Sequence, residues 1–143
     1  MNKVKKEIET LEKKIAPLRD KISQLEYKET LENQRPRIAK LVGTFMRSTY
    51  TEKEYGKIID LVESKDGSPY FLIKTLRITK EGNPYMHLDS VYPYLNKEWW
   101  DAEIPMSGWE KCSEEEYSDF EKEVMKEFST QKSLRATIKK YKF

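Results

Sequence analysis

The sequence has few of the residues that enzymes commonly use for catalysis. It contains one cysteine, Cys112, and one histidine, His87, among 143 residues. A single cysteine excludes an intrachain disulfide framework and a zinc site built from several thiolates. The five glycines form no phosphate-binding loop. We therefore expect no cofactor, no metal site and no catalytic residue, and we predict that the protein is not an enzyme.

The sequence also lacks an excess of one charge and any long apolar run. The 27 Lys and Arg nearly balance the 25 Asp and Glu, which leaves a net charge of +2. This charge is too small to give a strong field that attracts nucleic acid or a membrane surface. No stretch approaches the ~20 apolar residues of a membrane span, and the first residues contain no apolar core of a signal peptide. We expect a cytoplasmic protein with no membrane partner.

A regular apolar pattern opens the chain. A narrow stripe of this kind leaves a lone helix marginal in water, so the helix needs a partner. Docking on the chain's own β domain would cover the stripe, but the regular heptad spacing favours self-association. We predict that residues 1–35 are a coiled-coil arm for homo-oligomerisation, kinked or restarted at Pro17 and ending near Pro36. The stripe residues alternate in steps of four and three: Val4, Ile8, Leu11, Ile15, Leu18, Ile22 and Leu25.

The core and the flanks of this arm favour different orientations. Isoleucine at the a positions, with mostly leucine at d, is typical of a parallel dimer. In an antiparallel dimer, Lys5 would meet Glu26 and Glu12 would meet Arg19, whereas most flanking pairs of a parallel dimer would repel. Exposed ion pairs contribute about 0.5 kcal/mol or less each. The flanks therefore give the antiparallel dimer a slight preference.

After the arm, the pattern changes to short stretches rich in β-branched and aromatic residues. These stretches cover 38–47, 55–63, 68–78 and 84–92, and glycine-containing turns separate the later ones. They predict an α+β protein in which residues 36–143 form a small antiparallel β meander or an SH3-like barrel. A further short strand is expected around 108–111.

A C-terminal helix is predicted to close this β domain. Ser113 and Glu116 form a capping box, and an apolar stripe that begins at Tyr117 follows. We expect a helix over about 114–128 that packs on the sheet, an interruption at 129–133, and room for a second short helix over 133–141.

The stretch "YPYLNKEWWDAEIPMSGW", residues 92–109, concentrates aromatic residues in an otherwise polar chain. Burial in a small core explains part of this cluster. In an extended segment, however, the adjacent Trp99 and Trp100 would point to opposite faces, so one would face outwards. Tyrosine, tryptophan and arginine are enriched in protein-binding sites, and they also stack on bases. The candidate binding residues are Trp99, Trp100, Tyr92, Tyr94, Arg47, Tyr50, Tyr55 and Arg77.

The layout resembles that of small proteins of bacteriophages and prophages. The resemblance includes the heptad arm, the stretch "RIAKLVGTFMR" that opens the β domain and the stretch "WEKCSEEEYSDF" that begins the closing helix. It implies a viral protein that acts by binding, as an anti-defence inhibitor of its host. Such an inhibitor binds a host protein or sequesters a signalling nucleotide.

Two functions of different class are therefore expected. The first is a non-enzymatic oligomeric inhibitor that uses the aromatic and arginine residues of the β domain. The second is a nucleic-acid-binding or structural assembly module, in which the basic residues of 132–142 contact nucleic acid. The low net charge makes nucleic acid the weaker candidate as a partner.

Overall fold

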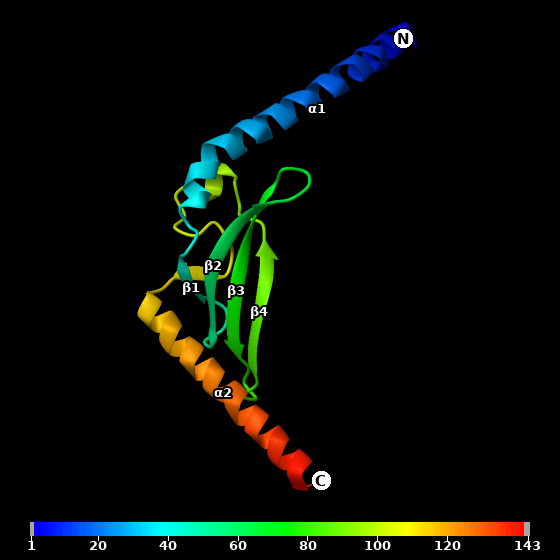
Figure 1. Ribbon diagram of the computed structural model, residues 1–143. Coiled ribbons are helices and arrows are strands. Elements are labelled where there is room, and N and C mark those ends of the chain that lie inside the picture. Colours follow the sequence, from blue (N-terminus) through cyan, green and yellow to red (C-terminus); the bar gives the residue numbers. More distant parts are fainter. Residues whose placement is uncertain (1, 142–143) are drawn as a thin grey trace. The chain divides into compact units, whose positions relative to one another are not determined.

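The protein has an α+β architecture. The computed structural model describes the backbone of residues 2–141 and the side chains of residues 2–131. A long N-terminal helix, five strands and a C-terminal helix follow one another along the chain (Figure 1). The chain divides into two compact units, Met1–Arg37 and Ile38–Phe143.

The N-terminal helix α1 spans Asn2–Ala39 and contains both Pro17 and Pro36. The helix continues three residues past Pro36, and the first compact unit ends at Arg37. The prediction of a strand that begins at Ile38 is wrong, because the first strand begins at Phe45. Ile38 is completely buried in the core of the β unit. The burial of this side chain offsets the local preference against helix beside a proline, because tertiary packing commonly overrides intrinsic propensity.

The five strands form one antiparallel sheet in the order β4-β3-β2-β1-β5. Strands β1 (Phe45–Ser48), β2 (Glu54–Glu63), β3 (Pro69–Ile78) and β4 (Pro84–Val91) make a meander. The short β5 (Trp109–Lys111) returns to pair with β1, which confirms the further strand expected near residue 108. Because β4 and β5 are opposite edges, the sheet is an open meander and not a closed barrel.

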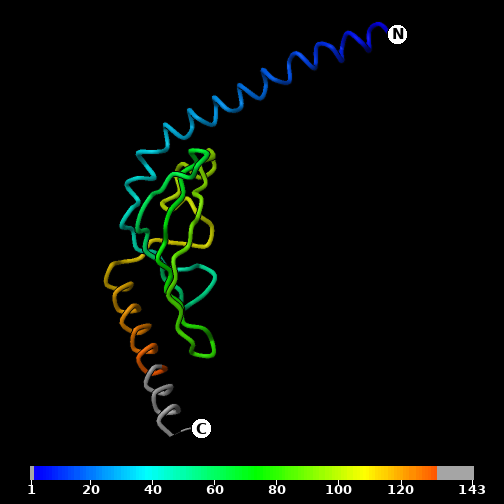
Figure 2. Tube along the Cα trace, turned by 45° about the vertical axis from the view of Figure 1, so that its right-hand side comes forward, coloured from blue at the N-terminus to red at the C-terminus, as the bar shows by residue number. Residues whose placement is uncertain are grey.

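The hairpins β2–β3 and β3–β4, whose connections can be followed in Figure 2, have the same turn hydrogen bonds. In the first, Ser64 N donates to Ser68 O at 2.9 Å; in the second, Thr79 N donates to Asn83 O at 2.9 Å. Gly67 and Gly82 occupy equivalent positions, with φ of 86° and 85°. This left-handed backbone favours glycine, so the glycine signals in the sequence located both turns.

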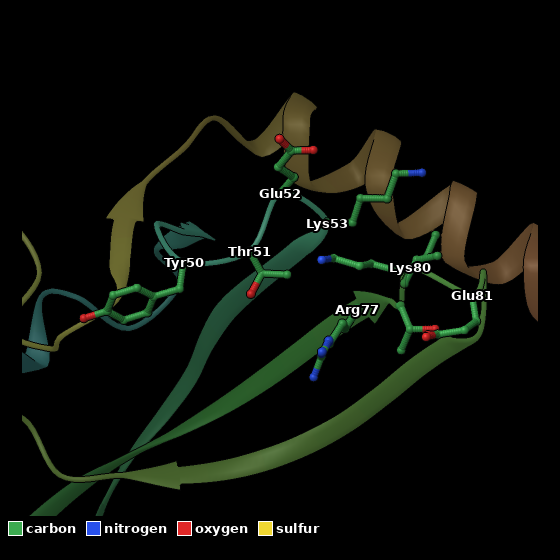
Figure 3. Close-up of a pocket in the computed structure, with 9 residues that line it drawn as sticks. Tyr50, Thr51, Glu52, Lys53, Arg77, Lys80 and Glu81 are labelled. Atoms are coloured by element: carbon green, nitrogen blue, oxygen red, sulfur yellow. The ribbon is translucent and has the colours of Figure 1, made fainter.

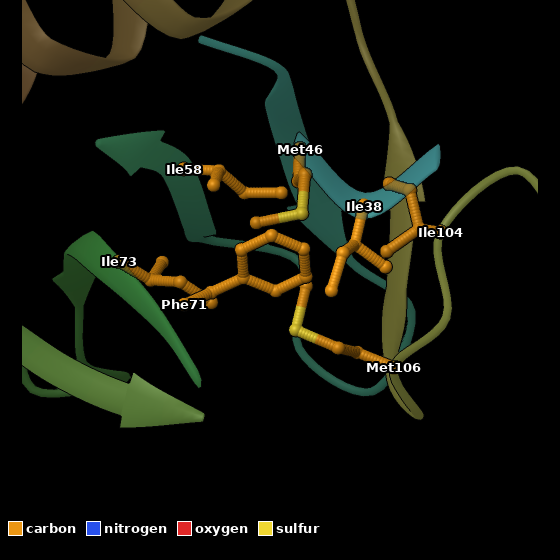
Figure 4. Close-up of a cluster of buried hydrophobic side chains, with 7 residues drawn as sticks. All are labelled: Ile38, Met46, Ile58, Phe71, Ile73, Ile104 and Met106. Atoms are coloured by element: carbon orange, nitrogen blue, oxygen red, sulfur yellow. The ribbon is translucent and has the colours of Figure 1, made fainter. Parts of the chain in front are cut away.

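One face of the sheet carries the larger core cluster (Figure 4). Side chains of three strands meet Ile38 there, and two residues from the segment between β4 and β5 cover them. Part of the aromatic-rich stretch 92–109 therefore closes this core, with Leu95 and Trp109 packed beside it. The cluster consists of Ile38, Met46, Ile58, Phe71, Ile73, Ile104 and Met106.

The opposite face packs against helix α2, which spans Glu114–Tyr141. Tyr117, Phe120 and Val124 of the helix bury against Leu76 and Ile78 of β3. The interior strand β3 therefore has apolar side chains on both of its faces. This explains why neither face of β3 is cleanly polar in the sequence.

The predicted C-terminal helix begins where its cap was expected but continues further than predicted. The backbone N–H of Glu116 donates to Ser113 Oγ at 3.1 Å, as expected for the cap. The predicted interruption at 129–133 is wrong, because α2 continues without a break. Thr130 Oγ1 donates to Lys126 O at 3.1 Å, so this polar residue satisfies its hydroxyl within the helix.

Candidate functional site

The apolar stripe of the arm is exposed along its whole length. Its seven residues, from Val4 to Leu25, retain 39–60% of their accessible surface. The stripe is the largest regular set of exposed apolar side chains in the part of the chain that the structure describes. It thus forms an apolar seam that helix α1 by itself leaves exposed.

Trp99 is the last residue of a short 3₁₀ helix, η1, which spans Lys97–Trp99, and Trp100 is its C-cap. The premise of an extended segment is therefore wrong at this point, and the two indoles do not alternate as they would on a strand. Trp99 is half-buried and stacks on Tyr94, with ring centroids 4.6 Å apart. Trp100 is 41% exposed, and its Nε1 donates to Leu95 O at 2.9 Å. Trp100 is thus the more exposed of the pair.

Other aromatic residues of the stretch divide between packing and exposure. Tyr92 is exposed and makes an edge contact with Tyr70, with ring centroids 5.8 Å apart. The backbone N–H of Tyr94 donates to Pro105 O at 2.7 Å and so ties the two ends of this segment together. Trp109 lies over Gly56, where a β-carbon in place of the glycine hydrogen would approach its ring to 3.1 Å.

Two of the candidate binding residues hold α2 on the sheet. Arg47 forms ion pairs with Glu110 of β5 and, at 3.4 Å, with Glu116 of α2. The half-buried Tyr55 packs its ring against Phe120, with centroids 4.6 Å apart. Burial raises the pKa of the Tyr55 phenol, and the Glu110 carboxylate raises the pKa of Arg47. Both residues therefore have clear structural partners within the chain.

The last two candidate binding residues, Tyr50 and Arg77, line the same hollow of about 610 Å³ (Figure 3). We call it the Arg77 hollow. It lies where the loop between β1 and β2 meets the turn between β3 and β4, because both connections lie at the same end of an antiparallel meander. Its lining consists of Tyr50, Thr51, Glu52, Lys53, Arg77, Ile78, Thr79, Lys80 and Glu81.

The charges of the Arg77 hollow nearly cancel. Three basic side chains, including Arg77 and Lys80, share the lining with the carboxylates of Glu52 and Glu81. Arg77 lies 3.8 Å from Glu54 on β2, and Lys53 lies 3.5 Å from Glu123 on α2. The hollow therefore offers charged groups of both signs, together with the hydroxyls of its threonines.

Tyr50 is the one aromatic residue among those that line the hollow, and 79% of its surface is accessible. Its hydroxyl is 2.9 Å from Ser107 Oγ, and its ring lies over Gly108. These contacts hold an exposed ring in one position, as suits a contact residue. Sequence reasoning identified Tyr50 and Arg77 but missed Lys53 and Lys80. The sequence feature that could have identified these two lysines is their position in two connections that lie at the same end of the sheet.

Cys112, a potential nucleophile, and His87, a potential base, do not line this hollow. Burial, aided by the Glu116 carboxylate, raises the pKa of the Cys112 thiol to about 11. Burial therefore outweighs the lowering of a thiol pKa that a helix N-terminus can cause. His87 Nε2 lies 3.0 Å from Asp89 Oδ2 on the same strand, and Thr75 Oγ1 donates to that oxygen at 2.9 Å.

Neither a metal-binding cluster nor a membrane-spanning helix occurs in the described part of the chain. Within residues 2–131, no three potential metal ligands cluster together. Neither helix, over the residues described, has the length and apolar character needed to cross a bilayer. Comparisons with protein-family models, with curated proteins and with solved structures find no match.

Proposed function

We propose that the protein is a non-enzymatic binding protein that self-associates through α1. One observation carries this proposal: all seven residues of a regular heptad stripe are at least 39% exposed in the single chain. An apolar stripe with a 3.5-residue repeat is the pattern that pairs helices in coiled coils. Association of α1 with α1 of another copy removes this stripe from water and gives the helix the partner it needs.

The Arg77 hollow is the surface on which this protein binds its partner. It combines an immobilised exposed tyrosine with an arginine, and both residue types are enriched at binding hot spots. Its carboxylates, Glu52 and Glu81, nearly balance its basic side chains. A polyanion such as a nucleotide or nucleic acid needs a net positive site, whereas a protein surface offers both charges. The partner we propose is therefore a protein.

An inhibitory role for this binding rests on a different argument. The order of arm, β domain and closing helix resembles that of small phage proteins, which implies an inhibitor of a host defence. Self-association supports such a role, because joined copies present several hollows at once and bind a multivalent target with higher avidity.

The first test concerns the arm. The double variant Leu11→Lys/Leu18→Lys places two charges on the stripe, whereas Thr10→Lys/Gln24→Lys adds the same charge on the outer face. Sedimentation velocity at micromolar concentration should show that the stripe variant loses the association made by α1. The outer-face variant should sediment as the wild type does. Equal sedimentation of both variants and the wild type would contradict the proposed seam.

The second test concerns the hollow. Immobilised wild-type protein and its variants are incubated with a bacterial lysate, and the retained proteins and small molecules are analysed. Tyr50→Ala and Arg77→Ala should each lower the amount of the retained protein at least 10-fold, since each removes a hot-spot side chain. Trp100→Ala, outside the hollow, serves as the control and should retain it. A partner lost with Trp100→Ala and kept with Tyr50→Ala would place the site in stretch 92–109. Retention of a nucleotide or nucleic acid alone would overturn the assignment of a protein partner.

A further inference from the structure

The two edges of the sheet differ in how well they are protected. Edge strand β5 has three residues, two of which are the charged Glu110 and Lys111. Edge strand β4 has eight residues, and none of them is Lys, Arg or Glu. Leu88, near its middle, is 61% exposed. Short length and charge are the usual protections of an edge strand, whereas β4 is long and carries a single acidic residue, Asp89.

The turn before β4 fixes which of its backbone groups lie at the open edge. Thr79 and Asn83 form a hydrogen-bonded pair, in which Thr79 N donates to Asn83 O at 2.9 Å. Hydrogen-bonded and non-hydrogen-bonded pairs alternate along an antiparallel ladder. In the register of β3 with β4, every second residue from Tyr85 therefore bonds to β3. The N–H and C=O groups left at the edge are those of Met86, Leu88 and Ser90.

We propose that this edge pairs with the β4 edge of a second copy, antiparallel and centred on Leu88. Leu88 then lies opposite its own equivalent, and Met86 lies opposite Ser90 of the second copy. The three edge residues of each copy make about six backbone hydrogen bonds. The proline at position 84 has no N–H to donate, so the new ladder extends from Met86 to Ser90.

Side-chain complementarity selects the second copy as the occupant. In this register, His87 of each copy lies opposite Asp89 of the other, in the closely spaced non-hydrogen-bonded pairs. An imidazole N–H thus faces a carboxylate twice across the two-fold axis, while the two Leu88 side chains meet on the other face. Shifting the register by two residues would centre it on His87 and place the two imidazoles against each other. The complementary pairing therefore favours Leu88 as the centre.

This contact is independent of the arm. Both α1 and β4 would then provide two-fold interfaces, so a chain that uses both belongs to an assembly larger than a dimer. A variant that disables the arm isolates the sheet contact, and the converse variant isolates the arm. Failure of one interface can therefore be distinguished from failure of the other.

The test uses the full chain carrying Leu11→Lys/Leu18→Lys. Sedimentation velocity at tens of micromolar should show a species of twice 17.1 kDa, formed through β4 alone. Adding Leu88→Lys should convert it to a monomer. Adding Ile59→Lys, which places the same charge on an exposed residue of β2, should leave the dimer intact. An arm variant that is monomeric at this concentration overturns the proposal, as does a dimer that persists with Leu88→Lys.

Amide hydrogen exchange reports the register directly. In the arm variant, the amides of Met86, Leu88 and Ser90 should exchange at least 10-fold more slowly than in the same chain with Leu88→Lys. The amides of Tyr85 and His87, which bond to β3, should be protected in both chains. Protection of Met86, Leu88 and Ser90 that is unchanged by Leu88→Lys would contradict pairing at this edge. Protection that appears only after a partner protein is added would assign the edge to that partner's strand.

Discussion

Tyr50 and Tyr55 lie five residues apart, yet the structure uses them in different ways. Tyr55 packs on Phe120 beneath α2, whereas Tyr50 is held above Gly108 with most of its ring in water. The two arginines differ in the same manner. Arg47 joins β5 to α2 through two carboxylates, and Arg77 lines the hollow with one more distant partner, Glu54. The sequence selected all four as candidates, but only Tyr50 and Arg77 line the Arg77 hollow, which we propose as the binding surface.

The thiol of Cys112 is predicted to react slowly. Its pKa is raised from 9.0 to about 11, because burial disfavours the thiolate and Glu116 repels it. At pH 8, a rise of two units lowers the thiolate fraction about 100-fold, and the thiolate is the reactive form. Alkylation by iodoacetamide should therefore be about 100-fold slower in the folded chain than in urea.

Glu116 supplies a check on the cause of this slow reaction. Glu116→Gln removes the repulsive carboxylate and releases Arg47, whose charge lowers the pKa of the thiol. Both effects favour the thiolate, so the alkylation rate of the folded variant should rise. A wild-type rate equal to that in urea would show that the thiol is not shielded.

At the scale of elements, the signals that located structure correctly are local ones. The capping box at Ser113 and the turn glycines, Gly67 and Gly82, act through hydrogen bonds or backbone angles within a few residues. Such features can be predicted from one sequence because their causes lie next to each other in it.

The elements that were predicted wrongly depend on distant contacts. Helix α1 continues to Ala39 while its residue Ile38 is buried among strands that come later in the chain. The 3₁₀ helix η1 stands where the sequence predicted an extended segment. It lies between Tyr94 and Pro105, which a backbone hydrogen bond joins. The Arg77 hollow was only partly foreseen for the same reason, because its two loops meet only after the sheet has formed.

At the scale of the whole molecule, assembly depends on how two arms align. In the antiparallel arrangement, Ile8 of one arm packs near Leu25 of the other and Ile15 near Leu18. Each core position i then lies beside core position 33 − i of the second copy, and the flanking e positions pair where their numbers sum to 31. This alignment places Lys5 against Glu26 and Glu12 against Arg19, whereas the parallel alignment places Glu7 against Glu12. Charge pairs between the two helices therefore favour an antiparallel dimer, with the two β domains at opposite ends of the paired arms.

Distances between spin labels distinguish the two alignments. With Cys112→Ser, a label at Lys3→Cys on the outer face lies beside position 30 of the second copy in the antiparallel dimer. The two labels are then about 27 residues, or about 40 Å, apart along the helix axis, whereas a parallel dimer places them at the same level along that axis. A label at Gln24→Cys should give about 22 Å, because that position is nearer the centre of the antiparallel seam. Two short distances of similar length would instead establish the parallel arm, in which the isoleucine and leucine core outweighs the charges at its flanks.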